Sequence, residues 1–229
     1  MLIRPPPISI LYEDNHLLAI DKPAGLATQG AASEDPSVVT QAREYLKQKY
    51  AKPGNVYIGV VSRLDALVTG VVVLARTSKA AARLTELFGS REVEKIYWAA
   101  VAGEVRSDEG TWTHWIAKDE SQQKVVEVER SSPGAQEARL HYRVVRRNPG
   151  TSLLEIRLET GRKHQIRVQC AAMGHPILGD SKYGSRRKFP SGIALHARRL
   201  SLLHPVRKEP WSIEAPLPVS WNSLGLDSK

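Results

Sequence analysis

The sequence predicts an α+β fold, with a mixed, mostly antiparallel sheet and packed helices. Short apolar runs typical of strands outnumber helix-like segments, and several neighbouring runs are joined by short turns. Of the 229 residues, 41% are hydrophobic and 25% are charged, which is typical of a globular protein with its own core. No linker or internal repeat is visible. We therefore expect a single domain over residues 1–229, with a stiff proline-containing lead-in at 1–7 and a tail at 219–229.

The first part of the chain predicts two strands, a helix, a buried strand and a second helix. The strands are expected at Ile8–Tyr12 and Leu17–Asp21, with a Glu-Asp-Asn turn between them. A helix with one polar side is expected at Val38–Lys49. The apolar run Val71–Ala75 indicates a buried strand, and Ser78 is expected to cap a helix that reaches Phe88.

The second part of the chain predicts more strands and one further helix. Strands are expected at Lys95–Val101, Ala138–Val144, Leu154–Leu158, Ala194–Leu203 and Trp211–Glu214. Ile166, Cys170 and Met173 form an apolar stripe, which predicts a helix over Gly161–Met173. Residues 104–136 are polar and rich in turn residues, so they are expected to form an insertion.

The charge balance favours a polyanionic partner. Lys and Arg total 33 against 24 Asp and Glu, a formal net charge of +9, and the pI is about 9.7. A basic protein that touches nucleic acid only non-specifically is the alternative. Cys170 is the single cysteine, so neither an intrachain disulfide nor a cysteine-rich metal site is expected. The chain shows neither an apolar signal region nor a stretch of membrane-spanning length, and we expect a cytoplasmic protein.

The first segment that could support catalysis runs from Ser62 to Gly70, just before the buried strand. Arg63 and Asp65 lie two residues apart, so in extended chain they share a face. A carboxylate beside a guanidinium stays ionised even when it is partly buried, which suits a nucleophile or a base. A structural salt bridge at the strand edge is the alternative.

The second segment, Glu159–Arg167, predicts a strand end followed by a basic helix start. Free N–H groups at a helix start favour anions, and Arg162, Lys163 and Arg167 would strengthen binding of phosphate or carboxylate. His164 and Arg167 are expected on one helical face. A solvated basic helix face is the alternative.

Other chemistries are poorly supported by the residue pattern. The chain has no phosphate-cradling glycine loop, no metal-ligand spacing and no serine nucleophile elbow. The segments around Gly174–Gly184 and Lys22–Leu26 are turns, and Tyr97 taken alone is a core or cross-strand aromatic. An unrelated Asp-dependent hydrolase of nucleotides or glycosides would need a second catalytic carboxylate, which no motif supplies.

Taken in order, these segments resemble the RluA-like pseudouridine synthases. The match runs from about Ile10 to Pro218 and rests on six motifs: Asp21-Lys22-Pro23-Ala24-Gly25-Leu26; Arg63-Leu64-Asp65 with Thr69-Gly70; Glu94-Lys95-x-Tyr97-x-Ala99; Thr160-Gly161-Arg162-x-His164-Gln165-Ile166-Arg167; Gly174-x-Pro176-Ile177-x-Gly179-Asp180-x-x-Tyr183-Gly184; and Leu195-His196-Ala197 with His204-Pro205. The resemblance implies a catalytic domain with a central RNA-binding cleft across its sheet. It also implies a reaction without cofactor or metal, in which the glycosidic bond of a uridine breaks, the uracil rotates and a carbon rejoins the sugar.

The resemblance also implies roles for individual residues. Asp65 matches the catalytic aspartate, as nucleophile or as base; Tyr97 matches the tyrosine against the target base. Arg167 matches the basic residue that pairs with the aspartate and holds it ionised. Arg63 matches the arginine that helps to displace the target nucleotide. Phosphate contacts are expected from Lys22, Arg162, Lys163 and Arg198, with His164 also in the substrate site.

The chain departs from the family pattern at four positions. Ser62 stands where His is usual, Val68-Thr69 stands where Thr-Ser is usual, and Gln169 stands where many relatives have His. Because Asp65, Tyr97 and Arg167 are intact, we expect activity on ribosomal or transfer RNA by a monomer. A catalytically impaired relative that acts as an RNA scaffold or chaperone is the alternative.

Overall fold

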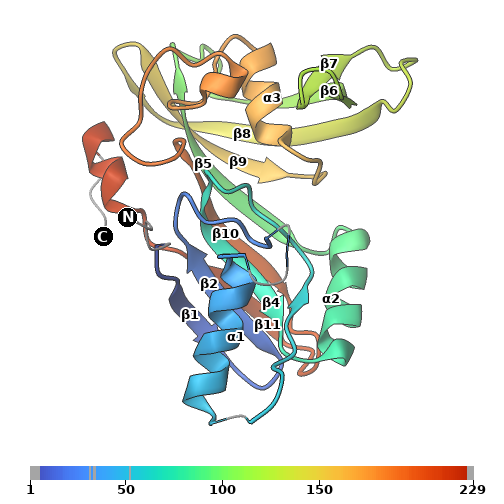
Figure 1. Cartoon of the computed structure of the whole chain (residues 1–229). Helices are drawn as coiled ribbons and strands as arrows, with labels where there is room; N and C mark the ends of the chain where they lie inside the picture. Colours follow the sequence, from blue (N-terminus) through green and yellow to red (C-terminus); the bar gives the residue numbers. More distant parts are fainter. Residues whose placement is uncertain (1–5, 31, 33–34, 52, 226–229) are drawn as a thin grey trace. The chain divides into compact units, whose positions relative to one another are not determined.

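The chain folds into two compact units in the computed structural model, which describes residues 6–30, 32, 35–51 and 53–225 (Figure 1). The first unit comprises residues 1–94 and 197–229, and the second comprises 95–196. Most of the predicted lead-in, residues 1–5, lies outside the described residues. No helix in the described ranges is long and apolar enough to cross a membrane.

The sheet of the first unit is covered by a helix on each face. Its elements are β1 (Ser9–Glu13), β2 (Leu17–Lys22), α1 (Val38–Lys49), β3 (Gly59–Val60), β4 (Thr69–Ala75), α2 (Ser78–Gly89), β10 (Leu195–Leu203), β11 (Pro210–Glu214) and a 3-10 helix at Val219–Leu224. The strand order is β1-β2-β4-β10, with β3 on β4 and β11 on β10. Alternate residues of β4 pack against opposite helices, Val72 towards α1 and Val73 towards α2. This two-sided burial explains why β4 is a continuous apolar run.

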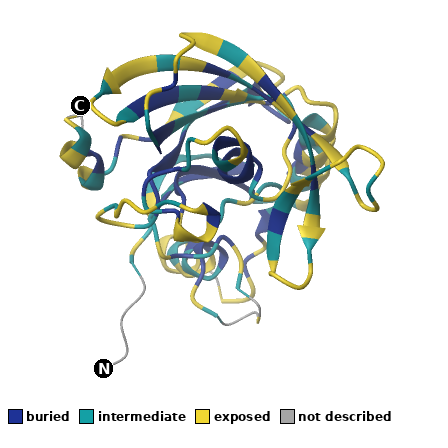
Figure 2. Cartoon of the chain, turned by 90° about the horizontal axis from the view of Figure 1, so that it is seen from above, coloured by how far each residue is buried: buried dark blue, intermediate teal, exposed yellow. Residues whose placement is uncertain are grey.

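The second unit is an antiparallel sheet with one helix. Its elements are β5 (Glu94–Ala102), β6 (Glu109–Asp119), β7 (Lys124–Val128), β8 (Gln136–Asn148), β9 (Thr151–Leu158), α3 (Gln165–Ala172) and a 3-10 turn at Ser181–Tyr183. The strand order is β5-β9-β8-β6-β7. Along β8, exposed or half-buried residues separate the buried Ala138, Leu140 and Tyr142, and β6 buries Trp112 and Ile116. Figure 2 shows how buried and exposed residues are mixed along the long strands. This is the pattern of a sheet with one face packed and the other exposed.

The predicted α+β class with a mixed sheet is confirmed, and α1 has its predicted bounds. Two local predictions are wrong. Thr77, not Ser78, caps α2 by accepting from the N–H of Ala80. Helix α3 begins at Gln165, because His164 is in the left-handed region at φ 55°. The segment 104–136, predicted as an insertion, contains β6 and β7, two strands that the sequence did not predict. The segment predicted as a tail starts with a 3-10 helix that buries Trp221. The predicted cleft stays a prediction.

A buried carboxylate ties β1 to α1 and β4 in the first unit. Glu13 accepts hydrogen bonds from Lys49 (2.7 Å), Tyr45 (2.8 Å) and Arg76 (3.0 Å), and also from the hydroxyl of Tyr50. Burial alone would raise the pKa of Glu13. The hydrogen bonds from Lys49, Tyr50 and Tyr45, and the charge of Arg76, outweigh that effect and lower the pKa to about 2.

Glu13→Gln is expected to lower the free energy of unfolding by about 1–3 kcal/mol at neutral pH, because the hydrogen bonds to the Glu13 side chain, which is 8% exposed, lose the carboxylate charge. A carboxylate with a lowered folded-state pKa stabilises the fold above its unfolded pKa, and this is lost as pH falls towards the folded value. The difference from wild type should therefore shrink between about pH 5 and pH 2. Urea unfolding across this range measures it. Glu120→Gln, at an exposed pair with Lys118, is the control; a Glu13→Gln loss independent of pH would contradict the argument.

Candidate active site

Asp65 lies on a loop before β4 whose backbone is held at several points. Thr28 forms a reciprocal pair with Leu64, since its hydroxyl donates to the Leu64 carbonyl (2.9 Å) and accepts from the Leu64 N–H (3.0 Å). The N–H of Gly25 donates to the carbonyl of Ala66 (2.8 Å), and the N–H of Val68 closes a turn on the carbonyl of Asp65 (3.0 Å). The half-buried Asp65 is therefore presented on a pre-organised backbone.

Lys22 is a buried residue of the first unit that holds this loop by hydrogen bonds. Its side chain is fully buried at 0% exposure, and its ammonium donates to the carbonyls of Pro23 (2.8 Å), Leu26 (2.9 Å) and Ala66 (3.1 Å). Three carbonyls match the three donors of an ammonium. This arrangement argues against the predicted phosphate contact for Lys22, because its donors are used by the backbone and its charge lies out of solvent.

The electrostatics around Lys22 also involve Asp65. Burial lowers the pKa of Lys22 to about 8, although the charges of Asp65 and Asp21 oppose this shift. Burial raises the pKa of Asp21 to about 6, against the opposing charge of Lys22. The ammonium therefore acts on the Asp65 carboxylate both through the backbone and through its field.

Gly70, two residues into β4, fixes the end of the loop against β10. Its φ is +107°, and a Cβ at this position would lie 2.3 Å from the carbonyl oxygen of Ala197. Only glycine combines this backbone angle with such a close approach. The Thr-Gly pair of the second predicted motif thus has a structural reason, and Val68 just before it is buried.

The second unit contains the other two predicted catalytic residues. Tyr97 lies half-buried on β5, opposite Ile156 of β9. Arg167 lies in the first turn of α3 and makes a bidentate ion pair with Asp180, from Nε to Oδ2 (2.7 Å) and from Nη2 to Oδ1 (2.8 Å). Both side chains are almost completely buried, at 4% and 1%. The sequence prediction missed Asp180 as a partner of Arg167; the signal was its place in the Gly-Asp-x-x-Tyr-Gly motif.

The remaining predicted substrate-binding residues differ in their surroundings. Arg63, Arg162 and Lys163 are exposed and available to a polyanion. Arg162 and Lys163 belong to the turn before α3, not to the helix, and Arg162 donates from Nε to the carbonyl of Glu137 (3.2 Å). Arg198 is half-buried; it bonds to the carbonyl of Ala215 and pairs with Glu214 (3.3 Å). His164 is also half-buried, and instead of sharing a helical face with Arg167 it precedes α3.

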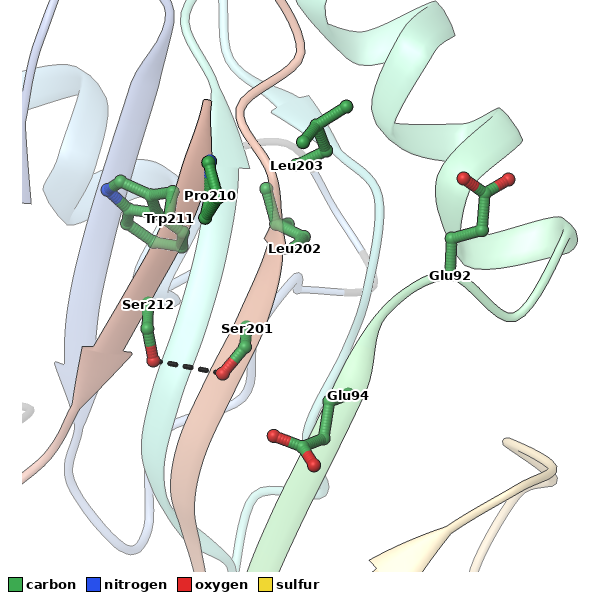
Figure 3. A pocket seen from close by; sticks show the side chains of 8 residues that line it. All are labelled: Glu92, Glu94, Ser201, Leu202, Leu203, Pro210, Trp211 and Ser212. Atoms are coloured by element: carbon green, nitrogen blue, oxygen red, sulfur yellow. Dashed lines mark hydrogen bonds between the residues drawn. The ribbon is translucent and has the colours of Figure 1, made fainter. Parts of the chain in front are cut away.

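Two further observations concern ligands. A hollow on the first unit is lined mainly by Leu202, Leu203, Pro210 and Trp211, and it contains none of the predicted site residues (Figure 3). Over the described ranges, no cluster of three or more His, Cys, Asp or Glu side chains is placed to hold a metal ion. The predicted catalytic residues lie elsewhere, on the Asp65 loop, β5 and α3.

Comparison with known proteins decides the family. The family model described as RNA pseudouridylate synthase matches residues 16–172, more than half of the chain. This chain belongs to the RNA pseudouridylate synthase family. It is an isomerase that acts on uridine in RNA, as the six motifs predict, and the matched segment includes Asp65, Tyr97 and Arg167.

Individual relatives agree with this membership. A Bacillus subtilis protein named as an uncharacterized RNA pseudouridine synthase is 37% identical over 219 residues, covering 95% of this chain and 71% of that protein. The ribosomal large subunit pseudouridine synthase D of Xylella fastidiosa is 40% identical over 227 residues, covering 93% and 66%. Human RNA pseudouridylate synthase domain containing 4 superposes with a TM-score of 0.79 at 28% identity, covering 95% of this chain and 93% of that one.

Proposed function

We propose that this pseudouridine synthase modifies selected uridines of ribosomal RNA, with Asp65 as the catalytic carboxylate. The observation that supports it most is the Asp65 loop, fastened by Lys22, Gly25 and Thr28 and flanked by the exposed Arg63. Such fastening keeps a reactive group in a fixed geometry, as catalysis requires. The ribosomal assignment rests on relatives named as large-subunit synthases and on the net charge of +9.

The proposal gives each residue a distinct task. Asp65 acts on the target nucleotide, Tyr97 lies against its base, and Arg167 pairs with Asp65 through the part of its guanidinium that Asp180 does not occupy. Arg63 helps to displace the nucleotide from its stack. Arg162 and Lys163 bind phosphates. The two units together would then form the single catalytic domain predicted from the sequence, working as a monomer in the cytoplasm.

Mapping of pseudouridine tests the proposed substrate. The purified protein is incubated with ribosomal RNA and with transfer RNA from cells that lack it, and new pseudouridines are located by chemical labelling and sequencing. New sites in ribosomal RNA support the proposal, and sites only in transfer RNA would move the assignment there. RNA binding without any new site in either pool would favour the scaffold interpretation and make Val68, next to the catalytic loop, the first position to restore to Thr.

Lys22→Met is expected to lower kcat about tenfold and leave KM for RNA within about twofold, because carbonyls beside Asp65 lose their donors while no phosphate contact is lost. Lys163→Met, at an exposed cation, should instead weaken RNA binding and reduce the slope of log K against log salt by about 1. Steady-state kinetics and filter binding at several salt concentrations measure both. A reduced salt slope for Lys22→Met would restore its predicted role as a phosphate contact.

A further inference from the structure

Tyr183 is a buried tyrosine that touches the Arg167 side chain in the second unit. The guanidinium carbon of Arg167 lies 4.9 Å from the centre of the Tyr183 ring, within the range of a cation–π contact. The tyrosine side chain is 8% exposed and packs in a small core with Ile116, Val125, Ala138 and Val168. Both partners of the contact are therefore out of solvent, where such a contact is strongest.

Two restraints act on the Arg167 guanidinium in different directions. The bidentate bond to Asp180 fixes the guanidinium within its own plane. The guanidinium carbon lies over the ring of Tyr183, which limits how far the group can move towards that side. Asp180 accepts hydrogen bonds from Nε and Nη2 of Arg167. The ion pair and the ring contact together therefore set the direction of Nη1, the remaining nitrogen of the guanidinium.

The hydroxyl of Tyr183 holds the ring itself in place. It accepts a hydrogen bond from the N–H of Val125 in β7 (3.1 Å), and it shares one with Nδ1 of His164 (2.8 Å). The His164 ring also meets the tyrosine edge-on, with centroids 5.7 Å apart. His164 has a left-handed backbone, which a non-glycine residue adopts only when its surroundings hold it there.

We propose that Tyr183 is a positioning residue for Arg167: its ring orients the guanidinium, and its hydroxyl fixes the ring between β7 and the turn that starts α3. This inference rests on the proposed function, in which Arg167 acts together with Asp65. Because Tyr183 is buried, at 8% exposure, it acts through Arg167 rather than directly on the substrate. Its removal should therefore lower kcat and leave KM for RNA nearly unchanged.

Two substitutions separate the ring from the hydroxyl. Tyr183→Leu removes both, and kcat should fall about tenfold to a hundredfold, with KM within about threefold. Tyr183→Phe keeps the ring and should lower kcat about two- to fivefold. Tyr142→Leu and Tyr142→Phe are the matched controls, since Tyr142 is also a tyrosine of this unit at 8% exposure that packs on another aromatic ring, Trp112. Their kcat should change less than about twofold.

The kinetic outcomes decide the proposal. A folded Tyr183→Leu variant with wild-type kcat would overturn it, and so would a kcat loss no larger than that of Tyr142→Leu, because general packing would then explain the effect. A rise in KM with unchanged kcat would also overturn it, since it would indicate substrate binding. Recovery of most of kcat by Tyr183→Phe supports the separate roles of ring and hydroxyl.

Amide hydrogen exchange tests the same contact without activity. In Tyr183→Phe the N–H of Val125 loses its acceptor, so its exchange, measured by NMR, should speed up about threefold or more while the amides of β9 stay unchanged. Unchanged exchange at Val125 would overturn the role of the hydroxyl even if Tyr183→Leu fails to fold. If the wild type forms no pseudouridine, the proposed function fails, whereas this measurement still reports whether Tyr183 holds β7.

Discussion

Asp65→Asn is expected to reduce pseudouridine formation at least about 10³-fold, with folding and RNA affinity unchanged. Asparagine has nearly the same shape as aspartate but lacks the charge, so it removes both a nucleophile and a base. The backbone of the loop should persist, because Lys22, Gly25 and Thr28 hold it through the backbone of Leu64 and Ala66.

Single-turnover assays on an RNA that contains the mapped site measure this effect. Asp108→Asn is the control, since Asp108 is an exposed aspartate that pairs with Arg147. If the Asp65 variant kept more than about a tenth of the wild-type rate, Asp65 would not be the catalytic carboxylate. If instead RNA binding were lost while the rate on bound RNA persisted, Asp65 would belong to substrate binding.

Local sequence signals located most elements of the fold. Helix α1 matched its predicted bounds because Ser37 and Thr40 form a capping box and its apolar residues recur at helical spacing. Strand β4 was evident because burial on both faces leaves only apolar residues. The start of α3 was mistaken because His164 adopts a left-handed backbone, and its side chain contacts Tyr183, which lies 19 residues later in the sequence. Local propensity contains no such information.

The pair β6 and β7 shows a second limit of sequence reasoning. Trp112 and Ile116 are buried with the period of a strand, but Thr113 between them is exposed and His114 and Trp115 are only half-buried. A polar turn around Glu120–Gln123 adds to the polar, turn-rich pattern that predicted an insertion. What makes the hairpin regular is its pairing with β8 and its packing on α3, and both are tertiary contacts.

The sequence indicated which side chains could take part in chemistry, but not which residues they bond to in the fold. Lys22, beside a Pro-Gly turn, suggested an exposed cation; its burial depends on the carbonyl of Ala66, 44 residues away. Asp180 belonged to a motif that, taken alone, indicated only turns. In the structure its carboxylate holds Arg167. Reactive side chains can be recognised from the sequence because each residue type has a known chemistry. Their hydrogen-bond and ion-pair partners could not be predicted, because residues far away in the sequence supply them.

Arg167→Met is expected to lower the free energy of unfolding by about 3–5 kcal/mol, because it leaves the Asp180 carboxylate buried without its partner. The double variant Arg167→Met, Asp180→Leu should recover most of that loss, since replacing both members of a buried ion pair by apolar residues is often neutral. Urea unfolding of the two single variants and the double variant gives the coupling free energy directly.

Activity should follow a different pattern from stability in the same variants. Arg167→Met and the double variant should both form pseudouridine at least about 100-fold more slowly than wild type, because the stability restored by Asp180→Leu does not restore the guanidinium that the proposed mechanism requires. Arg139→Met is the control, at an exposed ion pair with Glu159 where little stability and little activity should be lost. A double variant that regained activity along with stability would show that Arg167 serves the fold alone, and the role proposed for Tyr183 would fail with it.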